Sequence, residues 1–170
     1  LKYFGGSFDD LTAARAVCRL PLLRKEFIID PYQLFEAKAH GADVILLIAA
    51  VLDRDKIKQL SETAQSLGME ILLEVHNQSE LHKALMPSLN MVGVNNRNLK
   101  TFEVSLDTSM ALAELIPDDF VKVSESGMSS ITAIKALQPL GYRGFLIGEN
   151  FMKTKSPGLA ATDFIKSLTK

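Results

Sequence analysis

Short apolar stretches rich in branched residues alternate along this chain with longer segments of helical periodicity. We expect strands over Leu20–Arg24, Val44–Ala49, Glu70–Val75, Met91–Val94, Phe120–Ser124 and Gly144–Ile147. Strands that are apolar at nearly every position are buried on both faces, which is typical of a parallel sheet covered by helices. Their starts recur at roughly 25-residue intervals, the length of one βα unit. This pattern restricts the chain to the α/β class.

The segments between these strands carry the start and stop signals of helices. Ser7 with Asp10 resembles a capping box, and Asp30-Pro31 and Ser156-Pro157 each place a capping residue before a first-turn proline. Glycines stand where helices should end, at Gly41, Gly68 and Gly141. Six βα units can be counted in this way.

The number of units distinguishes two architectures. An eightfold βα barrel needs about 250 residues, so six units in 170 residues amount to about three quarters of one. The alternative is an open, doubly wound sheet, but the first predicted strand is not followed by a Gly-x-Gly-x-x-Gly turn. We therefore expect an incomplete TIM (βα)8 barrel, and a single domain over residues 1–170, because no Pro/Ser-rich linker interrupts the pattern.

The charge and apolar composition indicate what kind of molecule the chain binds. The net charge is −1 and no block of like charges occurs, which argues against nucleic acid or an acidic membrane and favours a small molecule. The longest apolar run, Val44–Leu52, is about half of a membrane span. The lone Cys18 and the spacing of the three histidines predict no metal site and suit a reducing, cytoplasmic location.

Polar groups gather where the predicted strands end. In a barrel the carboxyl ends of the strands carry the chemistry, although loops that begin there are also polar for ordinary reasons. The groups in question are Lys25, Glu74, Asn95, Glu125 with Ser126, and Gly148 with Glu149.

Two of these groups predict an acid–base centre. Glu74 lies within Ile71–Val75, where an unpaired buried carboxylate costs several kcal/mol, so it needs a cationic partner, a raised pKa or a substrate. Lys25 emerges between apolar residues, where desolvation would lower its pKa and make it a usable proton donor. The alternatives are a purely structural ion pair for Glu74 and, for Lys25, pairing with Glu26.

The later strand ends suit a phosphorylated ligand. Asn95 and Arg97 offer amide and guanidinium groups for hydroxyls and carboxylates, whereas Asn96 suits a turn and a binding role equally. The turns 124–127 and 147–150 each contain a glycine after a strand, as do the phosphate-binding loops of many barrels.

Longer strings in the chain resemble the indole-3-glycerol phosphate synthase family. They are Lys2-Tyr3-Phe4-Gly5-Gly6-Ser7, the run from Leu23 to Gln33, Gly93-Val94-Asn95-Asn96-Arg97-Asn98-Leu99, Ser124-Glu125-Ser126-Gly127 and Leu146-Ile147-Gly148-Glu149. The resemblance implies a cofactor-free barrel enzyme of tryptophan biosynthesis. Such an enzyme closes the indole ring of 1-(2-carboxyphenylamino)-1-deoxyribulose 5-phosphate with loss of carbon dioxide and water.

The resemblance also implies roles for individual residues. Lys25 is similar to the family's general-acid lysine, Glu74 to the glutamate that handles protons in condensation and dehydration, and Asn95 to a group that orients substrate hydroxyls. The remaining matches are Arg97 near the substrate, Ser126, Gly148 and Glu149 at the phosphate, and Phe4, Phe27 and Leu46 in the wall around the anthranilate ring.

One departure from the family concerns the start of the chain. Family members carry two further strands before the Lys2-Tyr3-Phe4 segment, with a lysine expected to hold the substrate carboxylate, so we expect this chain alone to have little or no activity. Two alternatives stay open. The chain could be a non-catalytic module that self-associates through unpaired strand edges, or another phosphosugar barrel enzyme such as phosphoribosylanthranilate isomerase.

Overall fold

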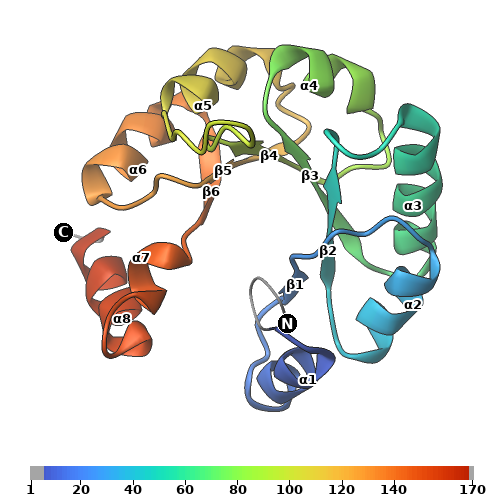
Figure 1. Cartoon of the computed structure of the whole chain (residues 1–170), viewed down its shortest axis with the longest axis horizontal. Coiled ribbons are helices and arrows are strands. Elements are labelled where there is room, and N and C mark those ends of the chain that lie inside the picture. The colour runs from blue at the N-terminus through green and yellow to red at the C-terminus, as the bar shows by residue number, and fades with distance from the viewer. Residues whose placement is uncertain (1–5, 169–170) are drawn as a thin grey trace. The chain divides into compact units, whose positions relative to one another are not determined.

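The computed structural model describes residues 6–168, which form alternating strands and helices (Figure 1). The strands are β1 (Leu23–Arg24), β2 (Val44–Ile48), β3 (Glu70–Val75), β4 (Met91–Asn95), β5 (Val121–Glu125) and β6 (Tyr142–Leu146). The helices are α1 (Phe8–Val17), α2 (Tyr32–Ala39), α3 (Arg54–Ser66), α4 (Gln78–Ala84), α5 (Asp107–Leu112), α6 (Ile131–Leu137), α7 (Glu149–Met152) and α8 (Pro157–Leu168), with 3-10 turns η1 (Ala113–Leu115) and η2 (Gln138–Leu140). The strands follow one another in the sheet in chain order, as successive βα units do.

All six predicted strands are present among the described residues, with some ends displaced. The first strand was expected from Leu20 but begins at Leu23. Pro21 has no N–H to donate to a neighbouring strand, and the N–H of Leu22 donates to the side chain of Asp43 at 2.8 Å. Pairing with β2 therefore starts one residue later, at Leu23 with Val44.

The helix signals act as predicted except at Asp30-Pro31, where Pro31 takes the cap position and α2 begins at Tyr32. The carboxylate of Asp10 accepts hydrogen bonds from the main-chain N and the hydroxyl of Ser7, at 2.7 and 3.0 Å. α8 begins at Pro157, and the three predicted stop glycines all have positive φ angles. Asp53, which follows β2, caps α3 by accepting from the N–H of Lys56 at 2.7 Å.

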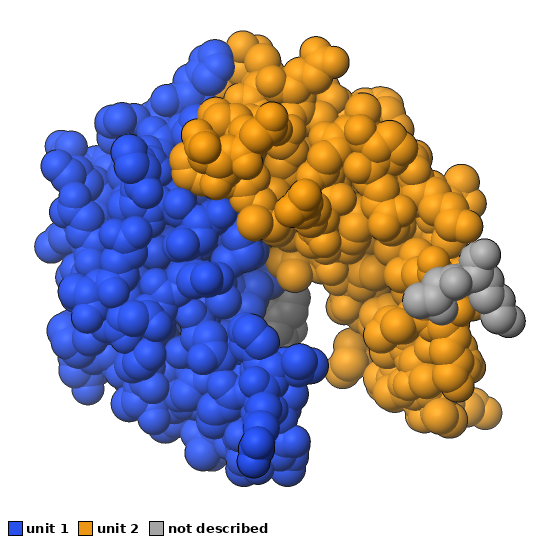
Figure 2. Space-filling view, turned by 180° about the vertical axis from the view of Figure 1, so that it is seen from behind, with its two compact units in different colours: residues 1–74, 79–91 blue, residues 75–78, 92–170 orange. Residues whose placement is uncertain are grey.

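The chain divides into two compact units, each described separately below (Figure 2). Unit 1 comprises Leu1–Glu74 and Ser79–Met91, and unit 2 comprises Val75–Gln78 and Val92–Lys170. In unit 1 every residue of β2 is buried, and α2 and α3 contribute the buried side chains Leu34, Ala37, Ile57 and Leu60. Burial of β2 on both faces is what its continuous apolar sequence predicts.

The register in unit 1 determines which side chains share a face of the sheet. Leu46 pairs with Leu72, and Ile48 pairs with Glu74, in parallel strands. Because paired residues in neighbouring strands point to the same side and alternate along each strand, Leu46, Leu72 and Glu74 project from one face. Glu74 therefore lies two residues after Leu72 on this face, next to the apolar side chains of Leu46 and Leu72.

An ion pair ties α1 to the other end of the strands in unit 1. Nη1 of Arg15 lies 2.8 Å from Oδ2 of Asp43, and its Nη2 donates to the carbonyls of Cys18 and Leu20. Asp43 immediately precedes β2, so Arg15 fixes α1 and the segment before β1 against the amino-terminal end of β2.

Unit 2 contains β4, β5 and β6 with α5 to α8. Unlike β2, its strands bury several polar groups, among them Lys122, Ser124 and Glu125 on β5. The ammonium of Lys122 donates to the carbonyl of Ala113 at 2.8 Å, at the point where the β5–β6 register shifts.

Candidate functional site

Lys25 and Glu74 meet in unit 1, as the sequence predicts. Nζ of Lys25 lies 3.0 Å from Oε2 of Glu74, and the Glu74 side chain is 5% exposed while that of Lys25 is 44% exposed. The carboxylate is therefore held inside the protein and the ammonium reaches it from a more open position. A cation and an acid at this distance can exchange or share a proton, which is the arrangement that acid–base catalysis needs.

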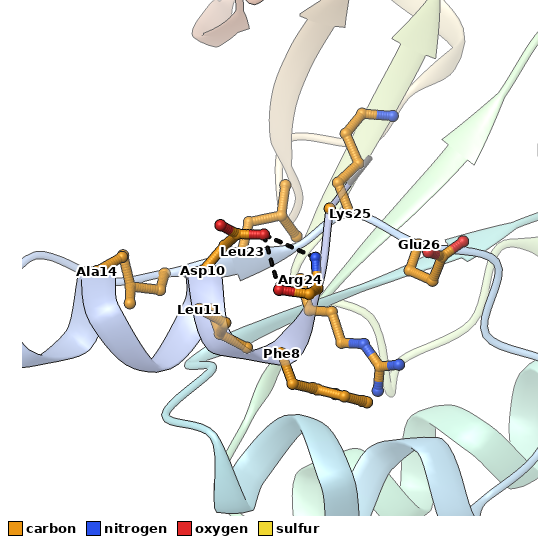
Figure 3. A pocket seen from close by; sticks show the side chains of 11 residues that line it. Phe8, Asp10, Leu11, Ala14, Leu23, Arg24, Lys25 and Glu26 are labelled. Carbon is orange, nitrogen blue, oxygen red and sulfur yellow. Dashed lines mark hydrogen bonds between the residues drawn. The ribbon is translucent and has the colours of Figure 1, made fainter. Parts of the chain in front are cut away.

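The neighbouring Arg24 points the other way. Extension of the β1–β2 register by one residue places Lys25 beside Leu46, on the face that carries Glu74, whereas Arg24 pairs with Ile45 on the opposite face. Figure 3 shows the Lys25 and Arg24 side chains leaving the strand in opposite directions, with Arg24 lying toward Phe8. The Arg24 guanidinium is 4.4 Å from the centre of that ring and donates to the carbonyl of Gln33. The alternative partner Glu26 instead accepts from the N–H of Phe27 at 2.7 Å.

A cavity of about 450 Å³ lies between α1 and β1 (Figure 3). Its described lining includes Ser7, Phe8 and Leu11 from α1 and its cap, and Leu23 and Lys25 from β1 and its end. Lys25 belongs to the described lining of this cavity, whereas Glu74 does not. The cavity is therefore distinct from the contact between Lys25 and Glu74.

The predicted hydrophobic wall has one exposed and one buried member. Phe27 is 56% exposed in the loop after β1, where a ligand could contact it. Leu46 is 2% exposed in the middle of β2, so it forms the layer beneath Lys25 and Glu74. Phe4 lies outside the described residues.

In unit 2 the predicted residues Asn95 and Arg97 are linked to each other. Asn95 ends β4, and its Oδ1 accepts a hydrogen bond from the N–H of Arg97 at 3.0 Å. Arg97 begins a small folded loop in which it pairs with Val104 in an antiparallel bridge. Its Nη2 lies 3.1 Å from Oε2 of Glu149, another predicted site residue.

The two predicted phosphate turns differ in their reasons for containing glycine. In the first, Ser126 follows β5 with φ 62° and Gly127 has φ 77°; a Cβ on Gly127 would lie 2.7 Å from Cγ1 of Val104. In the second, Gly148 has φ −117°, and a Cβ built on it would meet no atom within 4 Å. Backbone conformation and packing thus require glycine at 127 but not at 148. At position 148 the absence of a side chain leaves the main chain open to a ligand.

Two further polar residues at these strand ends are buried. Glu125, the last residue of β5, is 2% exposed, and like Glu74 it is a carboxylate at the end of a largely buried strand, although β5 also contains Lys122. Its sequence position places it among the polar groups at the strand ends, but the sequence predicted no role for it. Asn96 is also 2% exposed and is hydrogen-bonded within the protein, which argues against direct contact with a ligand.

Neither a metal centre nor a membrane span occurs in the part of the chain that the structure describes. Residues 6–168 contain no group of three or more His, Cys, Asp and Glu side chains placed to hold a metal ion. Over the same residues no helix is both long and apolar enough to cross a membrane.

Parallel βα units that follow one another in the sheet in chain order are the architecture of a TIM barrel. Solved structures agree on the fold. KGPDC from Streptococcus mutans superposes with a TM-score of 0.73 at 14% identity, covering 94% of this chain and 77% of that one. A mutant tryptophan synthase alpha-subunit from Pyrococcus furiosus also gives 0.73, at 18% identity, covering 95% and 71%. The chain has the fold of an incomplete TIM barrel.

Sequence relatives identify the family. The sequence model of the family described as indole-3-glycerol phosphate synthase matches residues 1–164, so this chain belongs to that family. Indole-3-glycerol phosphate synthase from Bacteroides thetaiotaomicron is 48% identical over 167 residues, and that from Delftia acidovorans is 48% identical over 159 residues. These matches cover 98% and 94% of this chain but 64% and 60% of the relatives' lengths.

Proposed function

We propose that this chain provides part of an indole-3-glycerol phosphate synthase, a carboxy-lyase of tryptophan biosynthesis. The reaction closes the indole ring of 1-(2-carboxyphenylamino)-1-deoxyribulose 5-phosphate with loss of carbon dioxide and water. The observation that carries the proposal is the 3.0 Å contact between Nζ of Lys25 and Oε2 of Glu74, found at strand ends in a member of this family.

Lys25 and Glu74 would divide the proton transfers between them. In its ammonium form Lys25 can protonate the ribulose carbonyl oxygen as the aromatic carbon attacks the carbonyl carbon. The carboxylate of Glu74, 3.0 Å from Nζ of Lys25, can accept the proton that the later steps release. Leu46, packed below the pair, keeps water from the inner side.

Asn95, Arg97, Ser126, Gly148 and Glu149 would bind the rest of the substrate. We propose that Asn95 orients hydroxyl groups, that Arg97 contributes positive charge nearby, and that the turns at 126 and 148 hold the phosphate. The open space above Gly148 supports this assignment, because a phosphate oxygen can approach a main-chain N–H closely only where no side chain intervenes. Phe27 would contact the anthranilate ring from its exposed position.

We also propose that the enzyme is cytoplasmic, uses no cofactor and takes a small phosphorylated molecule as its partner. The net charge of −1 supports this choice of partner over nucleic acid. The prediction that residues 1–170 form a single domain stays a prediction.

The test compares the substrate with its phosphoribosyl precursor. The chain is titrated with each compound, and the NMR signals of Lys25, Glu74, Ser126 and Gly148 are followed while product formation is assayed separately. We expect the carboxyphenylamino substrate to shift all four signals and to bind more tightly than the precursor. Equal binding would favour the isomerase alternative, and no change at Lys25 and Glu74 would contradict the proposal.

One observation favours a second candidate role, self-association. β1 is the first strand of the sheet, and Val17 and Leu20 beside it are 87% and 71% exposed. An edge strand next to exposed apolar side chains can pair with another chain. Sedimentation at several concentrations tests this, and a mass that stays monomeric throughout would contradict it.

A further inference from the structure

Asn96 directly follows β4, and both ends of its side-chain carboxamide have hydrogen-bond partners. Its Oδ1 accepts from the N–H of Ser109, on α5, at 3.1 Å. A main-chain N–H can only donate, so this contact fixes which end of the carboxamide is oxygen. The nitrogen Nδ2 must therefore face the opposite side, toward β5.

On that side Asn96 contacts three consecutive residues. Nδ2 lies 2.9 Å from Oγ of Ser124, 3.0 Å from the carbonyl of Glu125 and 3.1 Å from the carbonyl of Ser126. Its own N–H also donates to the carbonyl of Glu125 at 2.9 Å. The buried side chain of Asn96 is thus hydrogen-bonded to the last two residues of β5 and to the first residue after it.

The last of these three residues has an unusual backbone conformation. Ser126 has φ 62°, in the left-handed region that residues with a Cβ seldom adopt, and Gly127 follows with φ 77°. Such a conformation costs free energy and persists only where the surrounding structure enforces it. The contacts from Nδ2 of Asn96 to the carbonyls of Glu125 and Ser126 involve both peptide groups that flank Ser126, so they can restrain its φ and ψ angles.

The hydrogen-bond partners of Asn96 are in turn linked to one another and to β6. Oγ of Ser109 lies 2.8 Å from Oγ of Ser124, and the hydroxyl of Tyr142 on β6 donates to the carbonyl of Ser109 at 2.7 Å. Burial raises the pKa of the Tyr142 phenol to about 12, in keeping with a dry environment. A carboxamide anchored in this way has little freedom to reorient.

We propose that Asn96 is a positioning residue that holds Ser126 in its left-handed conformation and so directs the turn between β5 and α6. The effect on the conformation of Ser126 does not depend on what the protein binds. The consequence for phosphate affinity rests on the function proposed above, because that function places the phosphate at this turn.

The conformational part is tested by NMR on the chain itself. A strong NOE between a residue's own amide and α protons marks a positive φ, because the two protons are then close together. We expect this NOE for Ser126 in the wild-type chain, its loss in Asn96→Ala, and its retention in the control Tyr142→Phe, which breaks another hydrogen bond of the same network. A weak NOE in the wild type, or a strong one kept in folded Asn96→Ala, would overturn the proposal.

The design also covers a variant that fails to fold. Asn96→Asp keeps the shape but, when ionised, cannot donate to the carbonyls, and the same NOE is read from it. If neither single variant folds, Ser126→Gly is added, because glycine adopts positive φ without a steric penalty. Restored folding in the double variant supports the proposal. Persistent unfolding contradicts it, since Asn96 would then serve the core and not the turn.

The phosphate part uses inorganic phosphate as the probe, monitored at the amide signals of Ser126 and Gly127. We expect saturable binding to the wild type and to Tyr142→Phe, and roughly tenfold weaker binding to Asn96→Ala. Equal affinity in Asn96→Ala would contradict the link between turn and ligand. If the wild type does not bind phosphate here while the NOE pattern holds, the proposed phosphate site fails and the positioning role stands.

Discussion

The ammonium of Lys25 lies 3.0 Å from the carboxylate of Glu74, although the two residues are 49 positions apart in the chain. The partners differ in burial, since the glutamate side chain is 5% exposed and the lysine side chain is 44% exposed. The loss in the free energy of unfolding should therefore differ between a variant that lacks the lysine and one that lacks the glutamate charge.

Removal of the lysine should destabilise the protein more than neutralisation of the glutamate. Lys25→Met deprives a buried carboxylate of its ammonium, and we expect a loss of about 2 kcal/mol in the free energy of unfolding, typical of a hydrogen bond to a charged group. Glu74→Gln leaves a lysine that water can solvate, so its loss should be smaller. Urea unfolding measures both variants, and a larger loss in Glu74→Gln would contradict the assigned burial.

The two turn glycines should respond differently to alanine. At Gly127 the new Cβ would lie 2.7 Å from Val104 in a left-handed backbone, so Gly127→Ala should cost about 2 kcal/mol of stability. Gly148→Ala meets no atom within 4 Å and should leave stability nearly unchanged while weakening phosphate binding. Gly158 on α8, also in open space, is the control, because its alanine variant should affect neither binding nor folding adversely. Undiminished phosphate binding by Gly148→Ala would remove that residue from the site.

Asp43 should make folding depend on acid pH. The N–H of Leu22 chiefly, and then Arg15, lower the pKa of its carboxyl below the ordinary value. A lowered pKa in the folded state means that the stabilisation is complete above the unfolded value of about 3.9 and is lost as the pH falls through the folded value. The stability difference between wild type and Asp43→Asn should therefore shrink at acid pH. A difference that stays constant from neutral pH to pH ~3 would argue against the Leu22 and Arg15 contacts.

Tyr142 should ionise later than an ordinary tyrosine. Burial raises its pKa to about 12, against about 10 for a solvated phenol. Because the folded state holds the proton more tightly, the stabilising contribution is present below pH ~10 and disappears as the pH rises toward the folded pKa. Absorbance of phenolate during an alkaline titration should show a delayed step that Tyr142→Phe lacks. Ionisation of all tyrosines together near the ordinary value would contradict this burial.

The sequence was sufficient to locate the strands and to predict the contact between Lys25 and Glu74. Continuous apolar runs marked β2 and β3, and a carboxylate inside β3 required a cation, so Lys25 could be proposed as the partner of Glu74. The first strand began later than predicted because the side chain of Asp43, which precedes the neighbouring strand, takes the N–H of Leu22. Pro21, which cannot donate to a neighbouring strand, is a local signal for the later start, whereas the contact between Leu22 and Asp43 joins residues 21 positions apart and cannot be read locally.

Other features of the site also depend on distant partners. Asn96 could have been a turn residue or a ligand contact, and its role depends on Ser109 and Ser124, which are 13 and 28 residues away. The pairing of Arg97 with Glu149 joins residues 52 positions apart. Only the folded chain brings such residues together.

The catalytic assignment of Lys25 is tested most directly by the rate of ring closure, with Lys38 as the control. Lys38 also contacts an oxygen, the carbonyl of Gly68 at 3.3 Å, but stands at the amino-terminal end of β3, away from Glu74. Since the chain spans 64% of the Bacteroides relative and is expected to have little or no activity alone, the assay uses the chain joined to the part of that relative which it does not match.

We expect Lys25→Met to lower the rate of indole-3-glycerol phosphate formation about 100-fold or more, as loss of a general acid does, while Lys38→Met retains the wild-type rate. A wild-type rate in Lys25→Met would contradict the account, because the lysine–glutamate pair would then be structural.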